Sequence, residues 1–232
     1  MPDVLIFVLL LVAAYLFGSI PIAYLVVKWR YKTDIRKFGS GGVGGSNVFR
    51  SFSKPLGIVV GVFDGIKGAL LVWIAMLLGL STAFQVVIGL AVIAGHNWPI
   101  FLRFNAGRGL ATSLGVCFVI FPWSIVVFVA GAIFTLLVGT SPLPSLIGMA
   151  AMPLTAGLLR EPREVTLGLV VILLVLIFRR LSAPIAESSK SIDKKTLYLN
   201  RFLFDRDQRD QKSWISFKHK KSSDNSKTGK SQ

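Results

Sequence analysis

The sequence has few charged residues and only one cysteine. Charged side chains make up 16% of the 232 residues and hydrophobic ones 53%, which gives a mean hydropathy of +0.67. This composition is too apolar for a soluble domain, and the chain is long enough for several membrane spans, so we interpret it as an integral membrane protein. Cys117 lies within an apolar run, where it says nothing about disulfides and is expected to pack as a small hydrophobic residue.

Acidic residues are scarce as well. The chain has 11 Asp and Glu against 26 Lys and Arg, a formal net charge of +15. Because charged residues are so few, the positive charge must lie in loops and in the tail, where it sets orientation and meets anionic lipids or anionic substrates. These roles explain the charge better than nucleic acid does, so no nucleic-acid partner is expected.

What the sequence does have is a glycine-rich polar loop at 39–50 between two long apolar runs. Dense glycine lets the backbone adopt positive φ and brings N–H groups close to a ligand, and the loop adds hydroxyl, amide and guanidinium donors that suit phosphate. A flexible linker is the alternative. No Gly-Lys-Ser/Thr closes the loop, so it is not a Walker A motif. The residues of interest are Ser40, Ser46, Asn47 and Arg50, supported by Gly39, Gly41 and Gly44.

A charged pair lies inside the next apolar run, predicted as a span at 56–80. Asp64 and Lys67 are three residues apart, so they share one face of a helix and can pair. Each ionisable residue at membrane depth costs about 2.5–3.5 kcal/mol on insertion scales. A purely structural salt bridge is one explanation. The one we favour is that Lys67 offers its charge to phosphate while Asp64 holds that lysine in place.

A second polar loop follows the third predicted span, 84–102. His96 lies near the end of this span, and Gly107, Arg108 and Gly109 lead into another apolar run whose helix N-terminus would favour an anion. A lone histidine near a helix end is usually structural, but the neighbouring guanidinium favours a site here. After two crossings this loop returns to the side of the first one, so the two loops can form a single site.

Topology follows from the charges and the apolar runs. The first run, 4–27, lacks a basic n-region and a cleavage site, so it is read as a retained span with a kink at 18–21. The basic cluster at 28–37 places the first loop in the cytoplasm and the N-terminus outside. The later runs, 110–138, 143–159 and 166–178, are interrupted at Pro122, Pro144 and Pro153. Simple alternation gives six spans, but the basic tail requires five or seven. We expect a membrane-embedded domain at 1–182 and a largely disordered basic tail at 183–232.

Together these motifs resemble those of the bacterial acyl-phosphate-dependent glycerol-3-phosphate acyltransferases. The resemblance runs in order over the N-terminal two thirds of the chain. The matching segments are Gly18-Ser19-Ile20-Pro21, Asp34-Ile35-Arg36, Gly39-Ser40-Gly41 with Gly44, Asn47 and Arg50, Asp64-x-x-Lys67-Gly68, and Gly95-His96-x-x-Pro99 with Phe101, Phe104, Gly107, Gly109, Ala111 and Thr112.

The resemblance implies an all-α, polytopic inner-membrane enzyme of about seven transmembrane helices. Its N-terminus would lie outside and its C-terminus in the cytoplasm, with the active site facing the cytoplasm. It would transfer a fatty acyl group from acyl phosphate to glycerol 3-phosphate, giving lysophosphatidate and phosphate for phospholipid synthesis, without metal, coenzyme A or other cofactor. Membrane lipids would surround it, and a monomer is compatible with this reading.

The same resemblance assigns residue roles. Lys67 would supply a charge from its span, His96 would belong to the second loop, and Ser145 would be a further substrate contact. His96 is also the candidate catalytic base, with a binding role for His96 and proton transfer to a substrate phosphate as the alternative that we favour. The first loop would bind phosphate through Ser40, Ser46, Asn47 and Arg50, and the second through Arg108. Because acyl phosphate is already activated, no nucleophilic side chain is needed, and the protein would act by positioning and charge stabilisation.

The chain departs from the family pattern in both loops and at the end of the last span. Gly42 replaces an asparagine, Gly45-Ser46 replaces Ala-Thr, and Asn105 replaces a lysine, whereas Arg108 keeps its charge. Arg179-Arg180 lies where the family has Arg-His followed by Asn-Ile, so that histidine and that asparagine are both missing. The His-x-x-x-x-Asp pair of acyl-CoA-dependent acyltransferases is absent, since Phe101 follows His96 five positions on. The alternative function is a non-enzymatic membrane carrier or sensor of phosphorylated metabolites.

Overall fold

The computed structural model describes residues 2–104, 106–138, 143–182, 192–204 and 207, without the side chains of 2, 131–132, 134–138, 143–145 and 204. Within these ranges the chain is helical and has no strand, so the predicted all-α class is confirmed there. The helices are α1 (Pro2–Gly18), α2 (Ile22–Tyr31), η1 (Ile35–Lys37), α3 (Gly45–Ser51), α4 (Lys54–Leu77), α5 (Thr82–Asn97), η2 (Ile100–Leu102), α6 (Leu110–Ile120), α7 (Ser124–Val138), α8 (Leu143–Leu158), α9 (Arg163–Leu181) and α10 (Lys194–Phe204).

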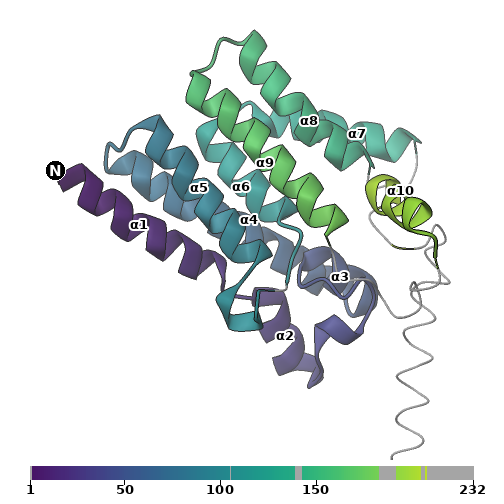
Figure 1. The fold of residues 1–232 in the computed structure, drawn as a ribbon. Helices are drawn as coiled ribbons and strands as arrows, with labels where there is room; N and C mark the ends of the chain where they lie inside the picture. The colour runs from purple at the N-terminus through teal and green to yellow at the C-terminus, as the bar shows by residue number, and fades with distance from the viewer. Residues whose placement is uncertain (1, 105, 139–142, 183–191, 205–206, 208–232) are drawn as a thin grey trace, which may run out of the picture.

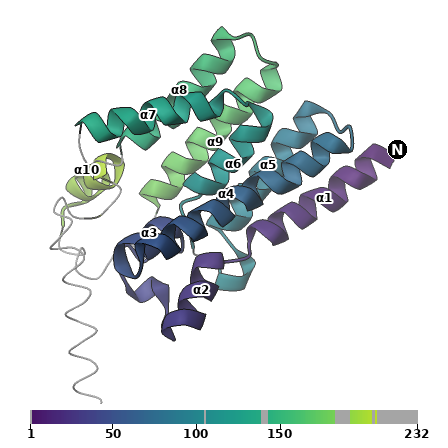
Figure 2. The same ribbon diagram turned by 180° about the vertical axis from the view of Figure 1, so that it is seen from behind.

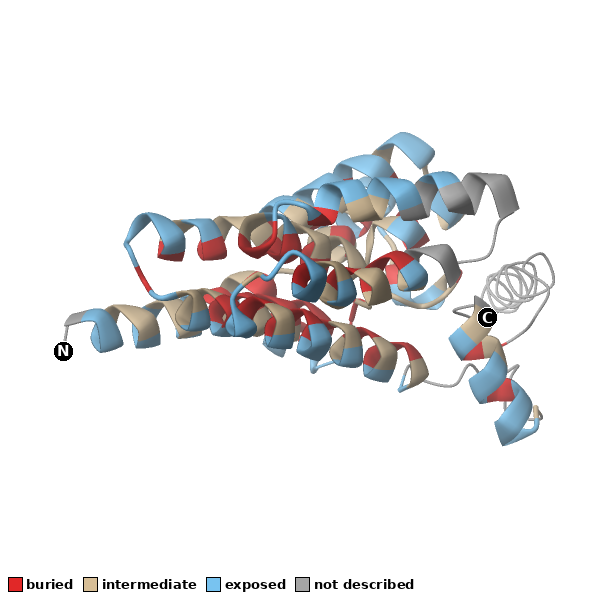
Figure 3. Cartoon of the chain, turned by 90° about the horizontal axis from the view of Figure 1, so that it is seen from above, coloured by how far each residue is buried: buried red, intermediate tan, exposed pale blue. Residues whose placement is uncertain are grey.

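The longer helices form a bundle. Helices α1 and α4 to α9 lie side by side, and the short α2 and α3 and the C-terminal α10 lie at the end away from the N-terminus (Figures 1 and 2). Figure 3 shows the buried residues along the middle of the bundle and exposed ones on its outer faces. Many of the exposed side chains are large and apolar, among them Leu9, Trp73 and Leu154. A bundle with an apolar exterior is suited to lipid rather than water.

Three segments of the described chain are long and apolar enough to cross a membrane: Asp3–Tyr31, Lys54–Leu77 and Thr82–Leu102. Leu110–Ile120 and Leu146–Leu158 are shorter apolar helices. The predicted interruption near Pro122 is a real break, because α6 ends before it and α7 begins at Ser124. Pro144 lies in the first turn of α8, where its missing N–H is not needed, and Pro153 lies inside the same helix. A count of seven spans remains a prediction.

The kink predicted in the first span is confirmed. Helix α1 ends at Gly18 and α2 begins at Ile22 after Pro21. The Ser19 hydroxyl donates to the Tyr15 carbonyl at 2.8 Å, and the Lys67 ammonium donates to the Ile20 carbonyl at 3.1 Å. A break inside a membrane helix leaves backbone groups without helical partners, and other polar groups must then bind them. Lys67, from another helix, does so here.

Glycines allow the bundle helices to approach closely. A Cβ at Gly18 would overlap the Val92 carbonyl, which lies on α5, and one at Gly68 would overlap the Thr112 carbonyl on α6. A Cβ at Gly115 would in turn overlap the Gly65 carbonyl. Small residues at such crossings let backbones pack against each other, as is common between membrane helices. These contacts set the spacing of α1, α4, α5 and α6, which carry the polar residues of the site.

Helix α10 lies within the segment expected to be largely disordered, and our sequence analysis did not predict it. Its buried face docks on the end of α9 through two arginines that bind each other's helix. Arg201 Nη1 donates to the Leu181 carbonyl at 2.7 Å, and Arg180 Nε donates to the Arg201 carbonyl at 2.8 Å. Both carbonyls lie in last turns, which have no intrahelical donors, so each arginine caps the C-terminus of the partner helix. Arg201 also pairs with Asp207 at 2.8 Å.

Candidate functional site

The first glycine loop is organised by the side chain of Asn47. Its Nδ2 donates to the carbonyls of Gly42 at 2.9 Å, Phe38 at 3.1 Å and Ile35 at 3.4 Å. Its Oδ1 accepts from the Ser51 hydroxyl at 3.1 Å and the Ser40 N–H at 3.3 Å. Asn47 is buried, and both ends of its amide are bound within the protein. The structure therefore gives Asn47 the role of shaping the loop.

Glycines are required where the loop turns around Asn47. Gly39 and Gly41 have φ of +51° and +69°, a region that residues with a Cβ rarely adopt. A Cβ at Gly39 would also overlap Asn47 Oδ1 and the Ser51 hydroxyl. Gly44 is different: its φ is −166° and nothing lies within 4 Å of a Cβ placed there. Packing and backbone geometry explain Gly39, but they do not explain Gly44.

The polar side chains of this loop are partly used and partly exposed. The Ser40 hydroxyl accepts from the Gly42 N–H at 3.2 Å, which tightens the loop. Ser46 and Arg50 are exposed on α3. Because they are four residues apart on a helix, they lie on the same face. They are the predicted ligand-binding side chains of the first loop that are exposed.

Before the loop, Asp34 and Arg36 form a small polar cap. The Asp34 carboxylate accepts the backbone N–H of Arg36 at 2.9 Å and its guanidinium Nη2 at 2.7 Å, and so begins η1. The Arg36 side-chain hydrogen bond lowers the pKa of Asp34 below its ordinary value of 3.8, against a smaller opposing effect of burial. This cap holds the backbone that leads into Gly39.

Asp64, Lys67 and His96 form a buried cluster. Lys67 Nζ lies 3.1 Å from Asp64 Oδ1, and His96 Nδ1 lies 3.6 Å from the same oxygen. The side chains of Asp64 and Lys67 are each 3% exposed. Because Lys67 also binds the Ile20 carbonyl, the structure ties it to the break between α1 and α2. The predicted pairing of Asp64 with Lys67 is present, and both groups are compensated inside the protein.

His96 connects this cluster to the second loop. A Cβ at Gly107 would overlap His96 Nε2, so a glycine there leaves that nitrogen facing the loop. Gly109 has φ of +76°, and a Cβ there would lie 2.6 Å from Asn97 Oδ1. Both glycines therefore have a steric reason that the sequence pattern alone did not supply. Asn105 lies outside the described residues.

The two glycine loops touch. The Val43 N–H of the first loop donates to the Ala106 carbonyl of the second at 3.5 Å. Val43 and Ala106 also line a small cavity of about 10 Å³, together with Asp64, Lys67 and His96. The sequence predicted that the loops share one side of the membrane. The structure brings them, and the buried cluster, into one place at one end of the bundle.

Arg179 belongs to this place, and sequence reasoning missed it. Its Nε donates to the Gly107 carbonyl at 3.0 Å, and its guanidinium lies over the Trp98 ring at 5.7 Å. It is close enough to Arg108 for the two cations to repel each other. Arg108 is half-buried. Because Arg108 and Arg179 are close to each other, two guanidiniums lie at the second loop. The available signal was Arg179-Arg180 at the end of the last apolar run, where the comparison with the family pattern assigned Arg179 no role.

Several buried polar groups lie near the same loop. The side chains of Asn97, Thr112 and Ser113 are buried, and their polar atoms have no hydrogen-bond partner among the described residues. No group of three or more His, Cys, Asp or Glu in the described chain could hold a metal ion. Ser145 lies in the first turn of α8, and its side chain falls outside the described residues.

An apolar groove runs along the part of α4 that also carries Asp64 and Lys67. It has a volume of about 430 Å³ and lies between α4, α6 and α7. Gly65, next to Asp64, and Ala111, two residues after Gly109, lie along it, and Phe118, Ile125 and Phe128 give it an apolar lining. Pockets of this size and character are typical of small-molecule sites.

The fold and the site define a class of protein: a helical membrane protein in which two glycine-and-arginine loops meet beside a buried histidine and an apolar groove. The model of one family, glycerol-3-phosphate acyltransferase, matches residues 8–188. The chain therefore belongs to the glycerol-3-phosphate acyltransferase family, as its motifs predicted.

Similar proteins support this assignment over most of the chain. Glycerol-3-phosphate acyltransferase 5 of Dehalococcoides mccartyi is 43% identical over 219 residues, 91% of this chain and 94% of its own. A relative from Endomicrobium trichonymphae is 36% identical over 179 residues, 75% of this chain and 88% of its own. Crystal structures of PlsY (YgiH), an integral membrane glycerol 3-phosphate acyltransferase, match with TM-scores of 0.69 for the glycerol 3-phosphate form and 0.68 for the lysophosphatidic acid form. The first is 31% identical and covers 75% of this chain and 88% of its own.

Proposed function

We propose that this protein transfers a fatty acyl group from acyl phosphate to glycerol 3-phosphate and releases lysophosphatidate and inorganic phosphate. The observation that supports this most is the contact between the two glycine loops beside His96, together with an apolar groove along α4 and α6. A reaction between an activated acyl chain and a phosphorylated alcohol needs these three parts: cations for phosphate, a place for the chain, and a point where the two meet.

Cations on two sides of the loops would bind the phosphates. Arg50 and Ser46 are exposed on α3, while Arg108 and Arg179 gather at the second loop. Each charge-assisted hydrogen bond is worth about 1.5–3 kcal/mol, and arginine can bind phosphate through two parallel bonds. Lys67 is buried against Asp64 and Ile20, so we assign it to holding the site together. Asn47 and Ser40 would shape the first loop.

The groove between α4, α6 and α7 would hold the acyl chain. Its lining is apolar, and it runs along α4 from Gly61 to Ala69, the stretch that contains Asp64 and Lys67, and along α6 from Ala111, two residues after Gly109. An acyl carbonyl at the Ala111 end of the groove would lie near the second loop, while the chain extends along helices that face lipid. Binding in this way would orient the two substrates and supply most of the catalysis.

The chemical step needs one proton acceptor. The glycerol hydroxyl oxygen forms a bond with the acyl carbonyl carbon, the bond from that carbon to the phosphate oxygen breaks, and phosphate leaves with the electron pair. The hydroxyl proton goes to His96 Nε2, which faces the second loop, while Asp64 lies beside Nδ1. A positioned general base contributes typically 10²–10⁴-fold, so His96→Gln should lower kcat by about that factor. A much smaller loss in kcat would indicate that the departing phosphate accepts the proton instead of His96.

The site would face the cytoplasm of a bacterial inner membrane, with the N-terminus outside, and the chain would work as a monomer. The basic cluster at 28–37 supports this orientation because positive loops stay on the cytoplasmic side.

The decisive experiment supplies purified protein in lipid with glycerol 3-phosphate and either palmitoyl phosphate or palmitoyl-CoA. We expect release of phosphate and formation of lysophosphatidate with palmitoyl phosphate alone. Binding of glycerol 3-phosphate without turnover would favour the carrier or sensor, and turnover with palmitoyl-CoA would identify a different donor. Arg50→Ala should greatly weaken use of glycerol 3-phosphate, whereas Arg163→Ala, at the opposite end of the bundle, should not.

A further inference from the structure

Helix α10 is held in one orientation by its inner face. Leu197 and Arg201 are each 3% exposed, and Arg201 is bound to the Leu181 carbonyl and to Asp207. Arg180 of α9 closes the contact by donating to the Arg201 carbonyl. Because these bonds come from both helices, α10 cannot rotate about its axis without breaking them. Its outer face is therefore fixed as well.

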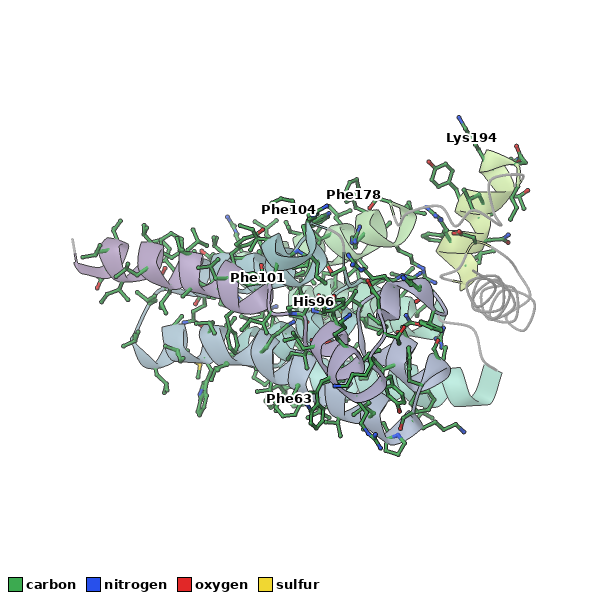
Figure 4. All side chains as sticks on the ribbon, turned by 90° about the horizontal axis from the view of Figure 1, so that it is seen from below. Phe63, His96, Phe101, Phe104, Phe178 and Lys194 are labelled. Carbon is green, nitrogen blue, oxygen red and sulfur yellow. The ribbon has the colours of Figure 1, made fainter. Side chains whose placement is uncertain are left out.

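That outer face is apolar and flanked by lysines. Tyr198, Leu199 and Phe202 are 51%, 50% and 40% exposed, and they follow Lys194 and Lys195 on the same side of the helix. We call these five residues the outer face of α10. Figure 4 shows Lys194 pointing away from the bundle at the far end of this helix. The contacts with α9 keep these three large apolar side chains exposed, which indicates a surface that binds a partner other than water.

The position of α10 and the charges near it point to the partner. The helix lies at the same end of the bundle as α2 (Figure 1), where the exposed Lys28, Arg30 and Lys32 gather. Charge alone would suit any polyanion, and apolar side chains alone would suit many proteins. Together they match the boundary of a bilayer that carries anionic headgroups, with the aromatic rings at headgroup level and the lysines in the surface potential.

We propose that the outer face of α10 binds the surface of the membrane in which the protein lies, and that it selects anionic phospholipid. Phe202, Leu199 and Tyr198 enter the headgroup boundary, while Lys194 and Lys195 pair with the anionic headgroups. This contact with lipid does not require the reaction at the glycine loops. Because α10 docks on the end of α9, the contact would link the lipid composition of the leaflet to the region where Arg179 binds the second loop.

The test uses an environment-sensitive fluorophore on a single cysteine in a Cys117→Ala background. The probe is attached at Phe202→Cys or, as the matched control, at Thr196→Cys, which is exposed on another side of α10. Both proteins are placed in nanodiscs of neutral phosphatidylcholine, with or without anionic phosphatidylglycerol. With the anionic lipid we expect a blue shift and quenching by brominated acyl chains at Phe202→Cys, and neither effect at Thr196→Cys.

Charge reversal separates the possible sources of such a signal. Lys194→Glu with Lys195→Glu should remove the shift gained from anionic lipid and leave the spectrum in neutral nanodiscs unchanged. Equal water exposure of the two probes in both lipids would overturn the proposal. A blue shift that depends on protein concentration and not on lipid charge would overturn it too, since a second copy or another protein would then cover this face.

Discussion

At the scale of single residues, the side chain of Asn47 makes several of the hydrogen bonds that hold the first glycine loop. Its amide joins the carbonyls on one side of the first glycine loop to the Ser40 N–H and the Ser51 hydroxyl on the other. A polar side chain with so many internal partners is costly to remove, because each lost bond leaves a partly buried group unpaired. The loop geometry that precedes Arg50 therefore depends strongly on Asn47.

Asn47→Ala should lower the free energy of unfolding by about 1–3 kcal/mol, since Phe38 and Gly42 would keep carbonyls without their donor. The same variant should raise the KM for glycerol 3-phosphate because the loop loses its shape. Thermal unfolding in detergent and steady-state kinetics would measure both effects. Ser46→Ala, one residue earlier and exposed, should leave stability unchanged. Normal stability of Asn47→Ala with impaired binding would instead make Asn47 a direct substrate contact.

For the buried pair of Asp64 and Lys67, the expected effect of substitution is on stability. Lys67→Met leaves a carboxylate in a membrane helix without its cation, and breaking such a pair typically destabilises by about 3–5 kcal/mol. Adding Asp64→Leu removes the stranded charge and should recover a large part of the loss. A double-mutant cycle on thermal stability measures the coupling. If the two single losses simply add in the double variant, the pair is not coupled.

At the scale of elements, the entry to the first loop depends on the cap formed by Asp34. Because hydrogen bonding with Arg36 lowers the Asp34 pKa in the folded state, the cap stabilises the protein fully above the ordinary value of 3.8. That contribution is lost as pH falls through the lowered folded pKa. Asp34→Asn should therefore be less stable than the parent at neutral pH and should approach it at acid pH. A constant difference across a pH series of unfolding temperatures would rule this out.

The crossing of α4 and α6 depends on glycine. A Cβ at Gly68 would overlap the Thr112 carbonyl, so Gly68→Ala must push the helices apart. Overpacking of this kind costs about 1–3 kcal/mol, which should appear as a lower unfolding temperature. Gly157→Ala on α8 is the matched control, because nothing lies within 4 Å of its Cβ. It should be neutral, or slightly stabilising from helix propensity. Equal behaviour of the two variants would mean that the crossing relaxes freely.

At the scale of the whole molecule, the loops, the basic cluster and α10 occupy one end of the bundle, away from the N-terminus (Figures 1 and 2). Positive residues favour the cytoplasmic side, so this end should face the cytoplasm.

Two single cysteines, one in η1 before the first loop and one just after the end of α4, test this orientation in a Cys117→Ala background. Lys37→Cys should react with an impermeant maleimide only from the cytoplasmic side, and Leu78→Cys only from the outside. Both positions are exposed, so a lack of reaction is not expected from burial. The reverse pattern would place both glycine loops outside and would separate them from cytoplasmic glycerol 3-phosphate.

Much of this protein was predictable because its signals are local. Apolar runs and scarce charge define a helical membrane protein, and the glycine loops and their spacing define the family, which is confirmed. The break at Ser19–Pro21 follows from proline chemistry, and the pairing of Asp64 with Lys67 follows from helical spacing. Each of these depends on residues close together in the chain.

The remaining features needed the tertiary structure because they join segments far apart in the chain. The binding of Lys67 to Ile20, the contact of Val43 with Ala106, and the position of Arg179 against Gly107 arise only when helices approach. Composition marked the tail as polar and did not predict α10, whose order comes from arginines that cap carbonyls across two helices. The sequence by itself determined the class, the family and the polar groups. Tertiary packing decided which of those groups are compensated internally and which are exposed.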